Sequence, residues 1–108
     1  MSEPRALSAR WTYLFVYDPE EIGPGAAVRA FLDSRREIVN WHRVFPNGYL
    51  LVSDALAVRL TELFLAFTGK RGRFIILDVG PGTDVGGWLP KRYWDQIHKP
   101  KAVWEWEE

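Results

Sequence analysis

The sequence predicts an α+β fold in which a four-stranded antiparallel sheet carries two helices on one face. Two observations carry this prediction. Four β-rich segments are spread along the chain, and helical segments lie between the first and second and between the third and fourth. The order β-α-β-β-α-β is the ferredoxin-like pattern. Right-handed crossovers then place the first and third strands in the middle of the sheet, with both helices on one face.

The first half of the chain contains a strand, a helix and a second strand. Residues 11–17 (WTYLFVY) are aromatic and β-branched and end at Asp18-Pro19, which is typical of a buried strand. After the turn at Gly23-Pro24-Gly25, apolar spacing predicts a short helix over residues 26–32. Residues 37–45 alternate as a strand does. The residues expected on one face of that strand are Ile38, Asn40, His42 and Val44.

The second half begins with a hairpin and ends with a Trp-rich extension. Pro46-Asn47-Gly48 predicts the hairpin turn because Asn and Gly accept positive φ, and residues 49–52 form the returning strand. Apolar residues at helical spacing over residues 56–67 predict a helix that ends at Gly69. Residues 74–79 (FIILDV) predict the fourth strand, and a short helix follows from Pro90 to residue 98.

We expect the 108 residues to form one domain, because two cores would each be too small to be stable. Its parts are a flexible N-terminus over residues 1–10, a ferredoxin-like core over 11–79 and a C-terminal extension over 80–108. The first ten residues lack the apolar region of a signal peptide, and no apolar stretch is long enough to span a bilayer. We therefore expect a cytoplasmic protein without a membrane partner.

Composition and charge exclude several classes of protein. The absence of Cys excludes a disulfide scaffold, a thiolate metal site and a thiol nucleophile. Fourteen basic residues balance 14 acidic ones, which argues against a protein that coats nucleic acid. The neutrality is a cancellation, however, because acids gather at 18–21 and 105–108 and bases between 70 and 101. Any nucleic-acid affinity is therefore expected from the basic residues of that stretch. They are Lys70, Arg71, Arg73, Lys91 and Arg92.

The predicted topology brings three loops to one end of the sheet. They carry Asp18 and Glu20, Asn47, and the basic stretch Lys70 to Arg73. Carboxylates beside bases suit a small anion or a metal ion. The alternative is a set of solvated loop charges that form weak surface pairs. Metal-ligand spacing of His, a G-x-S-x-G elbow and a phosphate-binding loop are all missing from the sequence.

The predicted sheet is apolar on both faces. Leu14 and Val16 are expected to point at the helices and Tyr13, Phe15 and Tyr17 at the opposite, open face. An open apolar face needs a cover, and the candidates are a second copy, the Trp-rich C-terminus or unpaired nucleic-acid bases. A protein partner explains the apolar neighbours better than base stacking does, because the third strand lacks the basic-Gly-aromatic signature of RNA-binding sheets.

The C-terminal residues AVWEWEE alternate Trp with Glu. Period-two alternation suits an edge strand with one buried face, so this segment could pair with an open sheet edge of its own chain or of a partner. A frayed acidic tail is the alternative. Two Trp side chains are costly to leave in water, which favours a contact through Trp104 and Trp106.

The segment TYLFVYD (residues 12–18) resembles the opening of the small CRISPR-associated ferredoxin-like endonuclease family of spacer acquisition. It also resembles related bacterial proteins labelled SinR-like. The resemblance continues through residues 40–54, 73–79 and 87–97, at the level of pattern. It implies a homodimer in which open sheet faces pack together and C-terminal segments add strands across the interface. It also implies that Asp18, the acid that ends the first strand, is a ligand of Mg²⁺ for phosphodiester cleavage.

We expect the chain to be a homodimeric binding or assembly module rather than an enzyme. Its context would be CRISPR-type or phage defence, with nucleic acid or a larger protein complex as a further partner. The alternatives are a Mg²⁺-dependent nuclease with Asp18 as catalytic and metal-binding residue, and single-stranded RNA binding on the open face. The residues expected at the dimer or partner interface are Tyr13, Phe15, Tyr17, Trp104 and Trp106.

Overall fold

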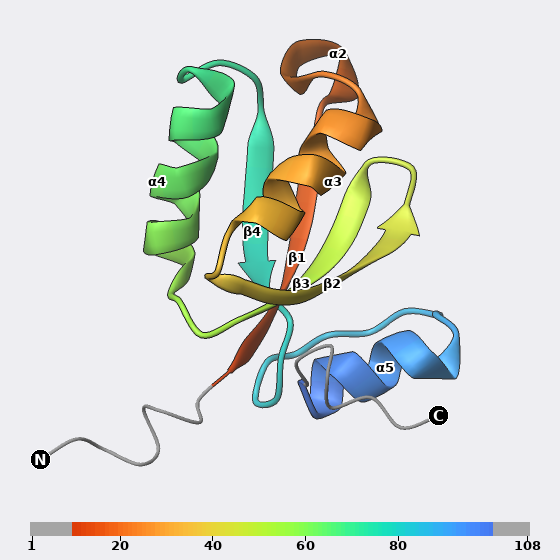
Figure 1. Cartoon of the computed structure of the whole chain (residues 1–108). Coiled ribbons are helices and arrows are strands. Elements are labelled where there is room, and N and C mark those ends of the chain that lie inside the picture. Colours follow the sequence, from red (N-terminus) through yellow and green to blue (C-terminus); the bar gives the residue numbers. More distant parts are fainter. Residues whose placement is uncertain (1–9, 101–108) are drawn as a thin grey trace, which may run out of the picture.

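A computed structural model describes residues 10–100 of the chain. Its centre is a four-stranded antiparallel sheet in the order β2-β3-β1-β4 (Figure 1). The elements are β1 (Trp11–Tyr17), α2 (Pro19–Ile22), α3 (Gly25–Ser34), β2 (Ile38–Phe45), β3 (Gly48–Ser53), α4 (Ala57–Thr68), β4 (Phe74–Asp78) and α5 (Lys91–His98). The predicted α+β class and its four-stranded antiparallel sheet, with the first and third strands in the middle, are confirmed.

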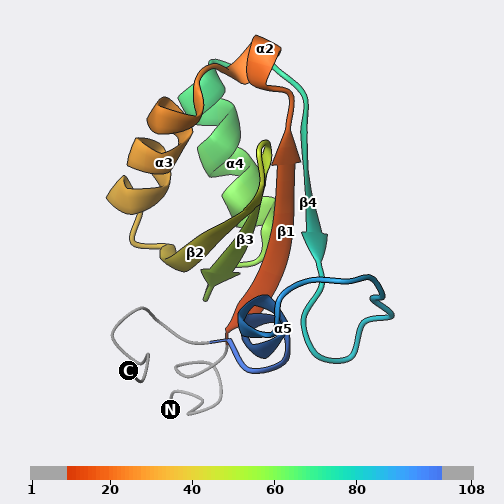
Figure 2. The same cartoon turned by 90° about the vertical axis from the view of Figure 1, so that its right-hand side faces the viewer.

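Each of the two crossovers joins strands that have one antiparallel strand between them, in agreement with the ferredoxin-like order. The helices α3 and α4 cover one face of the sheet, which we call the helix face (Figure 2). The helix α5 packs on the opposite face, which we call the second face. The longest described helix, α4, has 12 residues, and no described helix could cross a membrane. The predictions for residues 1–9 and 101–108, Trp104 and Trp106 included, lie outside the described residues.

The main core is an aromatic layer between the sheet and the helices α3 and α4. Phe15 stacks on Phe64 of α4 with ring centroids 4.2 Å apart, and on Tyr17 at 5.3 Å. The buried helix residues Val28 and Leu32 of α3 complete this layer. Offset aromatic pairs contribute beyond the area that they bury, so this layer adds to the stability of the fold through both burial and ring contacts.

The prediction for the direction of the β1 side chains is wrong. Tyr13, Phe15 and Tyr17 point toward the helices and are 2%, 0% and 2% exposed. The Tyr13 hydroxyl donates to the Ala55 carbonyl at 3.0 Å, and burial raises the pKa of this phenol to about 12. These three residues therefore form the core and cannot serve as a partner surface or as a platform for RNA bases.

The second face is aliphatic where β1 and β3 cross it. Leu14 and Leu50, which are opposite each other in the β1–β3 register, pack against Ile97 of α5 and Val79. The Thr12 hydroxyl, fully buried, donates to the Gln96 carbonyl at 2.7 Å and fixes α5 to the sheet. This helix and the preceding loop cover one end of the second face, so the C-terminal extension is in part a cover for the sheet.

The hairpin differs from the prediction in one detail. The loop consists of Pro46 and Asn47, and Gly48 is the first residue of β3 and pairs with Phe45. Gly48 does not need positive φ; it makes room, because a Cβ there would lie 3.0 Å from Cδ2 of Phe45. The phenyl ring of Phe45 therefore lies over Gly48, on the second face.

The strand β2 is less regular than its sequence alternation predicts. The β2–β3 register shifts between Ile38 and Asn40 and again between Arg43 and Phe45. In consequence Ile38 joins the core under α3 and α4, whereas Val44 packs with the residues around α5. The predicted common face for these two residues is wrong, because a bulge adds a residue and inverts the alternation.

Candidate functional site

The three loops predicted to meet at one end of the sheet do so. Asp18, Asn47 and Arg73 line a shallow cavity of about 580 Å³, together with residues of β1 and β4. The Asn47 amide donates to the Tyr17 carbonyl at 3.1 Å, which fixes the hairpin to the end of β1. The charged groups of this end pair with one another. Arg73 Nε and Nη2 donate to the two carboxylate oxygens of Glu21 at 3.0 and 3.2 Å.

These contacts are surface ion pairs. Hydrogen bonds from Arg73 hold the pKa of Glu21 below its usual value, and Glu21 in turn raises the pKa of Arg73. The Arg73 side chain is 82% exposed, so water and salt screen the attraction. The geometry therefore agrees with solvated loop charges that form surface pairs, rather than with a site for an anion or a metal ion. The paired charges neutralise one another and leave little positive potential to attract an anion.

Asp18, the residue expected to act as a metal ligand, has a structural position. Its Oδ1 accepts from the Glu20 amide at 3.0 Å, which is the N-cap contact of α2. Its Oδ2 lies 3.6 Å from Arg73 Nη2. Both oxygens are therefore engaged, and no group of three His, Cys, Asp or Glu suited to a metal occurs among residues 10–100. As arranged in one chain, these residues do not fit Mg²⁺, which prefers several oxygen ligands in an octahedron.

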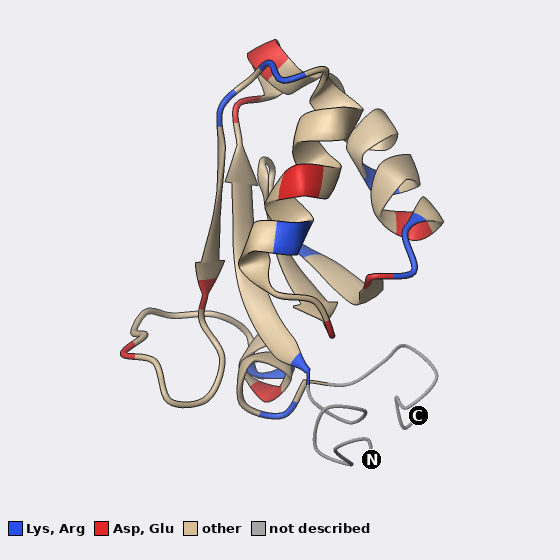
Figure 3. Cartoon of the chain, turned by 90° about the vertical axis from the view of Figure 1, so that its left-hand side faces the viewer, with Lys and Arg blue, Asp and Glu red and all other residues tan. Residues whose placement is uncertain are grey.

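The five basic residues predicted to bind nucleic acid fall into two separate groups. Lys70, Arg71 and Arg73 lie at the α4–β4 connection, whereas Lys91 and Arg92 lie on α5. Figure 3 shows basic residues at both ends of the molecule, with a largely uncharged sheet between them. Lys91 pairs with Asp95 at 3.1 Å, and the Arg92 guanidinium lies over the Tyr93 ring at 4.6 Å. The fold thus does not join the five into one basic patch.

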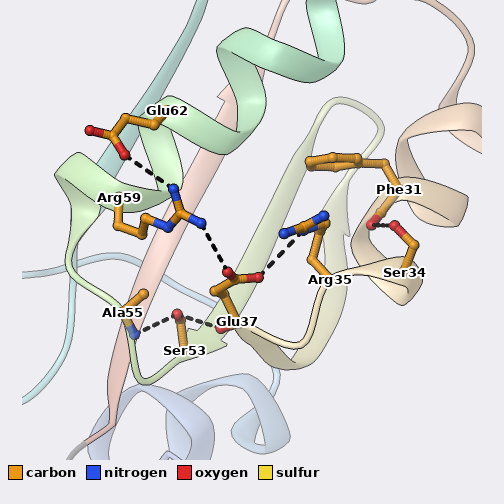
Figure 4. A network of polar contacts seen from close by, with 8 residues as sticks. All are labelled: Phe31, Ser34, Arg35, Glu37, Ser53, Ala55, Arg59 and Glu62. Carbon is orange, nitrogen blue, oxygen red and sulfur yellow. Dashed lines mark hydrogen bonds and ion pairs between the residues drawn. The ribbon is translucent and has the colours of Figure 1, made fainter.

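A polar network that sequence analysis did not identify lies where α3, β2, β3 and α4 meet (Figure 4). The Glu37 carboxylate forms ion pairs with Arg35 and Arg59, both at 3.4 Å. The Glu37 backbone carbonyl accepts a hydrogen bond from the Ser53 hydroxyl at 2.6 Å. Burial disfavours the charged carboxylate, but its own backbone amide and the two guanidinium groups outweigh burial and lower the pKa of Glu37. The network joins four elements and has a structural role.

The second face carries the most distinctive surface of the described chain. In the β1–β4 register Ile75 lies opposite Val16, and Leu77 lies opposite Leu14. Val16 in turn lies opposite Gly48, which the Phe45 ring covers. These side chains therefore form continuous rows across the sheet. The exposed side chains in these rows, together with Trp88 in the loop that precedes α5, are called the apolar patch. Its members are Phe45 (47% exposed), Ile75 (53%), Leu77 (44%) and Trp88 (84%).

A cavity of about 180 Å³ opens beside the apolar patch. Its floor is the sheet, its far wall is α5, and the loop before α5 forms its rim. Its lining is apolar apart from the indole N–H groups of two Trp residues. The residues that line it are Leu14, Val44, Phe45, Leu50, Val79, Val85, Gly86, Gly87, Trp88, Leu89, Trp94 and Ile97. Exposed Phe45 and Trp88 belong to both features, so patch and cavity are one surface.

The sequence indicated this surface only in outline. Residues 74–79 predicted a strand that is apolar on both faces, without indicating that Ile75 and Leu77 are the exposed ones. Phe45 was assigned to the hairpin strand without a surface role, and Trp88 only to a Trp-rich extension. The dipeptide Gly86-Gly87 before Trp88 was the available signal, since it indicates a loop rather than a buried element.

Comparison with models of protein families, with curated proteins and with solved structures gives no match for this chain.

Proposed function

We propose that this chain is a small self-associating binding module whose second face pairs with a second copy. The observation that supports this proposal most strongly is that Phe45, Ile75 and Leu77 remain exposed in continuous rows, although α5 covers the other end of the same face. Large exposed apolar patches on small domains mark interaction sites. The patch also has the composition of an interface centre, rich in aromatic residues and free of charge.

The geometry favours a protein over a nucleic acid as partner. A nucleic-acid surface needs a basic patch, and the basic residues of this chain stand in two separate groups, partly neutralised by Glu21 and Asp95. The aromatic residues of β1, which were the candidates for base stacking, are buried in the core. A second copy of the chain presents a matching apolar surface, and C2 pairing is the commonest mode of self-association.

The size of the surface is a second requirement. A specific, stable interface buries about 800 Å² on each partner. The four patch residues are distributed over β2, β4 and the loop before α5, so the patch spans the sheet from edge strand to edge strand. An interface centred on the patch would therefore extend over most of the second face outside α5.

The test is sedimentation equilibrium of the full chain and of two variants that add the same charge. Ile75→Glu places a carboxylate within the patch, and Val58→Glu places one at an exposed apolar site on α4, where Val58 is 67% exposed. We expect the wild type and Val58→Glu to be dimers and Ile75→Glu to dissociate at least about 100-fold more readily, because the interface would desolvate the new charge.

A wild-type chain that sediments as a monomer at every accessible concentration would refute the proposal. Equal dissociation of both variants would also contradict it, since the effect would then come from net charge and not from the patch. Circular dichroism of both variants controls for folding.

A further inference from the structure

Trp88 is the most exposed of the large apolar side chains in residues 10–100, at 84%. It follows two glycines, and Gly87 has a φ of 145°, a conformation that side-chain-bearing residues rarely adopt. This local backbone carries the indole away from the body of the protein. A Trp side chain that packs buries about 150–250 Å², so leaving one in water has a large cost unless a partner covers it.

The cavity beside Trp88 has the size and chemistry of a receptor for an aromatic side chain. It measures about 180 Å³, and Leu14, Leu50 and Ile97 are among its walls. An apolar cavity of about 150 Å³ in another protein stays dry and binds benzene. A water molecule needs two to four polar partners, and beyond two indole N–H groups and the backbone of Gly86 and Gly87 the lining side chains are apolar. The cavity therefore favours an aromatic ring over solvent.

We propose that in the dimer Trp88 of each copy inserts into this cavity of the other copy. The inference rests on the proposed function, and it names the contact that holds the two copies together. The protruding Trp88 and the receiving cavity share one rim. A two-fold interface requires that Trp88 and the cavity lie close together on one chain, because the same patch on each copy must supply both the inserted group and the cavity that receives it.

The contact area is consistent with a stable dimer. Two inserted indoles would bury about 300–500 Å² of aromatic surface, near a quarter of the roughly 1,600 Å² of a standard interface. The remaining area has an available source in Phe45, Ile75 and Leu77, which are continuous with the cavity rim. Aromatic anchors in central pockets commonly dominate binding energy, and Trp is the most enriched of them.

The experiment uses two complementary variants of the full chain. Trp88→Ala removes the inserted group and trims the cavity at its rim but keeps its walls on the sheet and α5, whereas Val85→Phe fills the cavity from the loop and leaves Trp88. We expect each variant alone to dissociate at least about 100-fold more readily than the wild type. In a mixture, Trp88 of the filled variant can still enter the empty cavity of the other. We therefore expect the mixture to associate at least about tenfold more tightly than either variant alone.

At a protein concentration at which both proteins are monomers, Trp88→Ala should unfold at the same temperature as the wild type, because the Trp88 side chain is exposed in the single chain. If Trp88→Ala dimerises like the wild type while Ile75→Glu dissociates, the insertion is refuted and the proposed function stands. If the wild type is itself monomeric, both fail.

Two further outcomes would refute the insertion. The first is loss of the dimer in Trp88→Ala without rescue in the mixture, which would place Trp88 against another surface of the partner. The second is an intact dimer in Trp88→Ala combined with dissociation of a Trp104→Ala/Trp106→Ala double variant. That result would identify the C-terminal segment as the occupant of the cavity.

Discussion

The helix face and the second face of the sheet are both apolar, yet they differ in side-chain type and in cover. The helix face presents Tyr13, Phe15 and Tyr17 to two helices, and all three are buried. The second face presents Leu14 to one short helix, α5, whereas Val16 lies outside that contact and Ile75, opposite Val16, stays exposed. The aromatic side of β1 is therefore the side that stabilises the fold, whereas the aliphatic side is only partly covered.

Adjacent residues of β1 give the largest expected contrast. Phe15→Ala should lower the free energy of unfolding by about 3–5 kcal/mol, because it removes a ring that stacks on Phe64 and Tyr17 and leaves a cavity. Val16→Ala, on the half-buried second face, should cost less than about 1.5 kcal/mol. Urea unfolding followed by circular dichroism, at one low protein concentration, measures both. Equal losses would contradict the assignment of the two faces.

The contact that fixes α5 to the second face gives the next effect. Thr12→Val removes the hydroxyl that donates to the Gln96 carbonyl at 2.7 Å, at a cost of about 1–3 kcal/mol for a buried bond. We expect faster amide hydrogen exchange in α5 (Lys91–His98), with little change in α3 and α4. Thr12→Ser keeps the hydroxyl and is the control. Unchanged exchange in α5 for Thr12→Val would show that packing alone holds the helix.

The order of the elements was predictable from the sequence, apart from the one-turn helix α2, and the reason is local. The Asp18-Pro19 boundary after WTYLFVY, the helical spacing that ends at Gly69 and the stretch FIILDV are each readable without knowledge of their neighbours. The meeting of Asp18, Asn47 and Arg73 followed from topology alone. Charges on loops that a fold must bring together are therefore predictable even without side-chain positions.

The face assignment of β1 failed for an equally physical reason. Thr12 is the only residue of β1 that is neither apolar nor aromatic, and one Thr at the start of a strand is a weak marker of which alternate set faces away from the helices. The decision depends on which set fits the ridge of α4 residues around Phe64, a tertiary property. Exposure of Trp88 is tertiary in the same way, because it depends on where α5 stops covering the sheet.

The charged end of the sheet supplies a smaller effect and separates structure from catalysis. Asp18→Ala should lower the free energy of unfolding by about 1 kcal/mol, the typical value of an N-cap, whereas Asp18→Asn keeps a capping oxygen and should cost less. Thermal unfolding of both variants measures the difference. The second readout is incubation of the wild type and Asp18→Asn with Mg²⁺ and labelled DNA or RNA. Cleavage by the wild type that Asp18→Asn abolishes would overturn the structural assignment of Asp18.

The smallest expected effect is a pH dependence of the α5 contact. His42 of β2 lies beneath α5, with its ring centroid 6.0 Å from that of Tyr93. Burial lowers the pKa of His42, and the nearby Arg92 lowers it further. Arg43 is the adjacent charged residue on β2. The folded state therefore binds a proton less readily than the unfolded state, in which the pKa of His is about 6.5.

The sign of the effect follows from this difference. Above about pH 6.5, His42 is neutral in the folded and the unfolded state, and its contribution to stability is complete. As the pH falls below that value, the unfolded state takes up the proton first. The free energy of unfolding then declines until the pH has passed the lower pKa of the folded state. We expect the free energy of unfolding to fall between about pH 7 and pH 5.5, a window above the ordinary pKa of Asp and Glu.

His42→Gln should remove most of that slope, whereas His98→Gln, on the exposed end of α5, should keep it. A slope retained in His42→Gln and lost in His98→Gln would place the titrating group at the end of α5 rather than beneath it. Because His42 contacts α5 on the second face, its titration would be confined to the less completely covered side of the sheet, and the aromatic core would not respond.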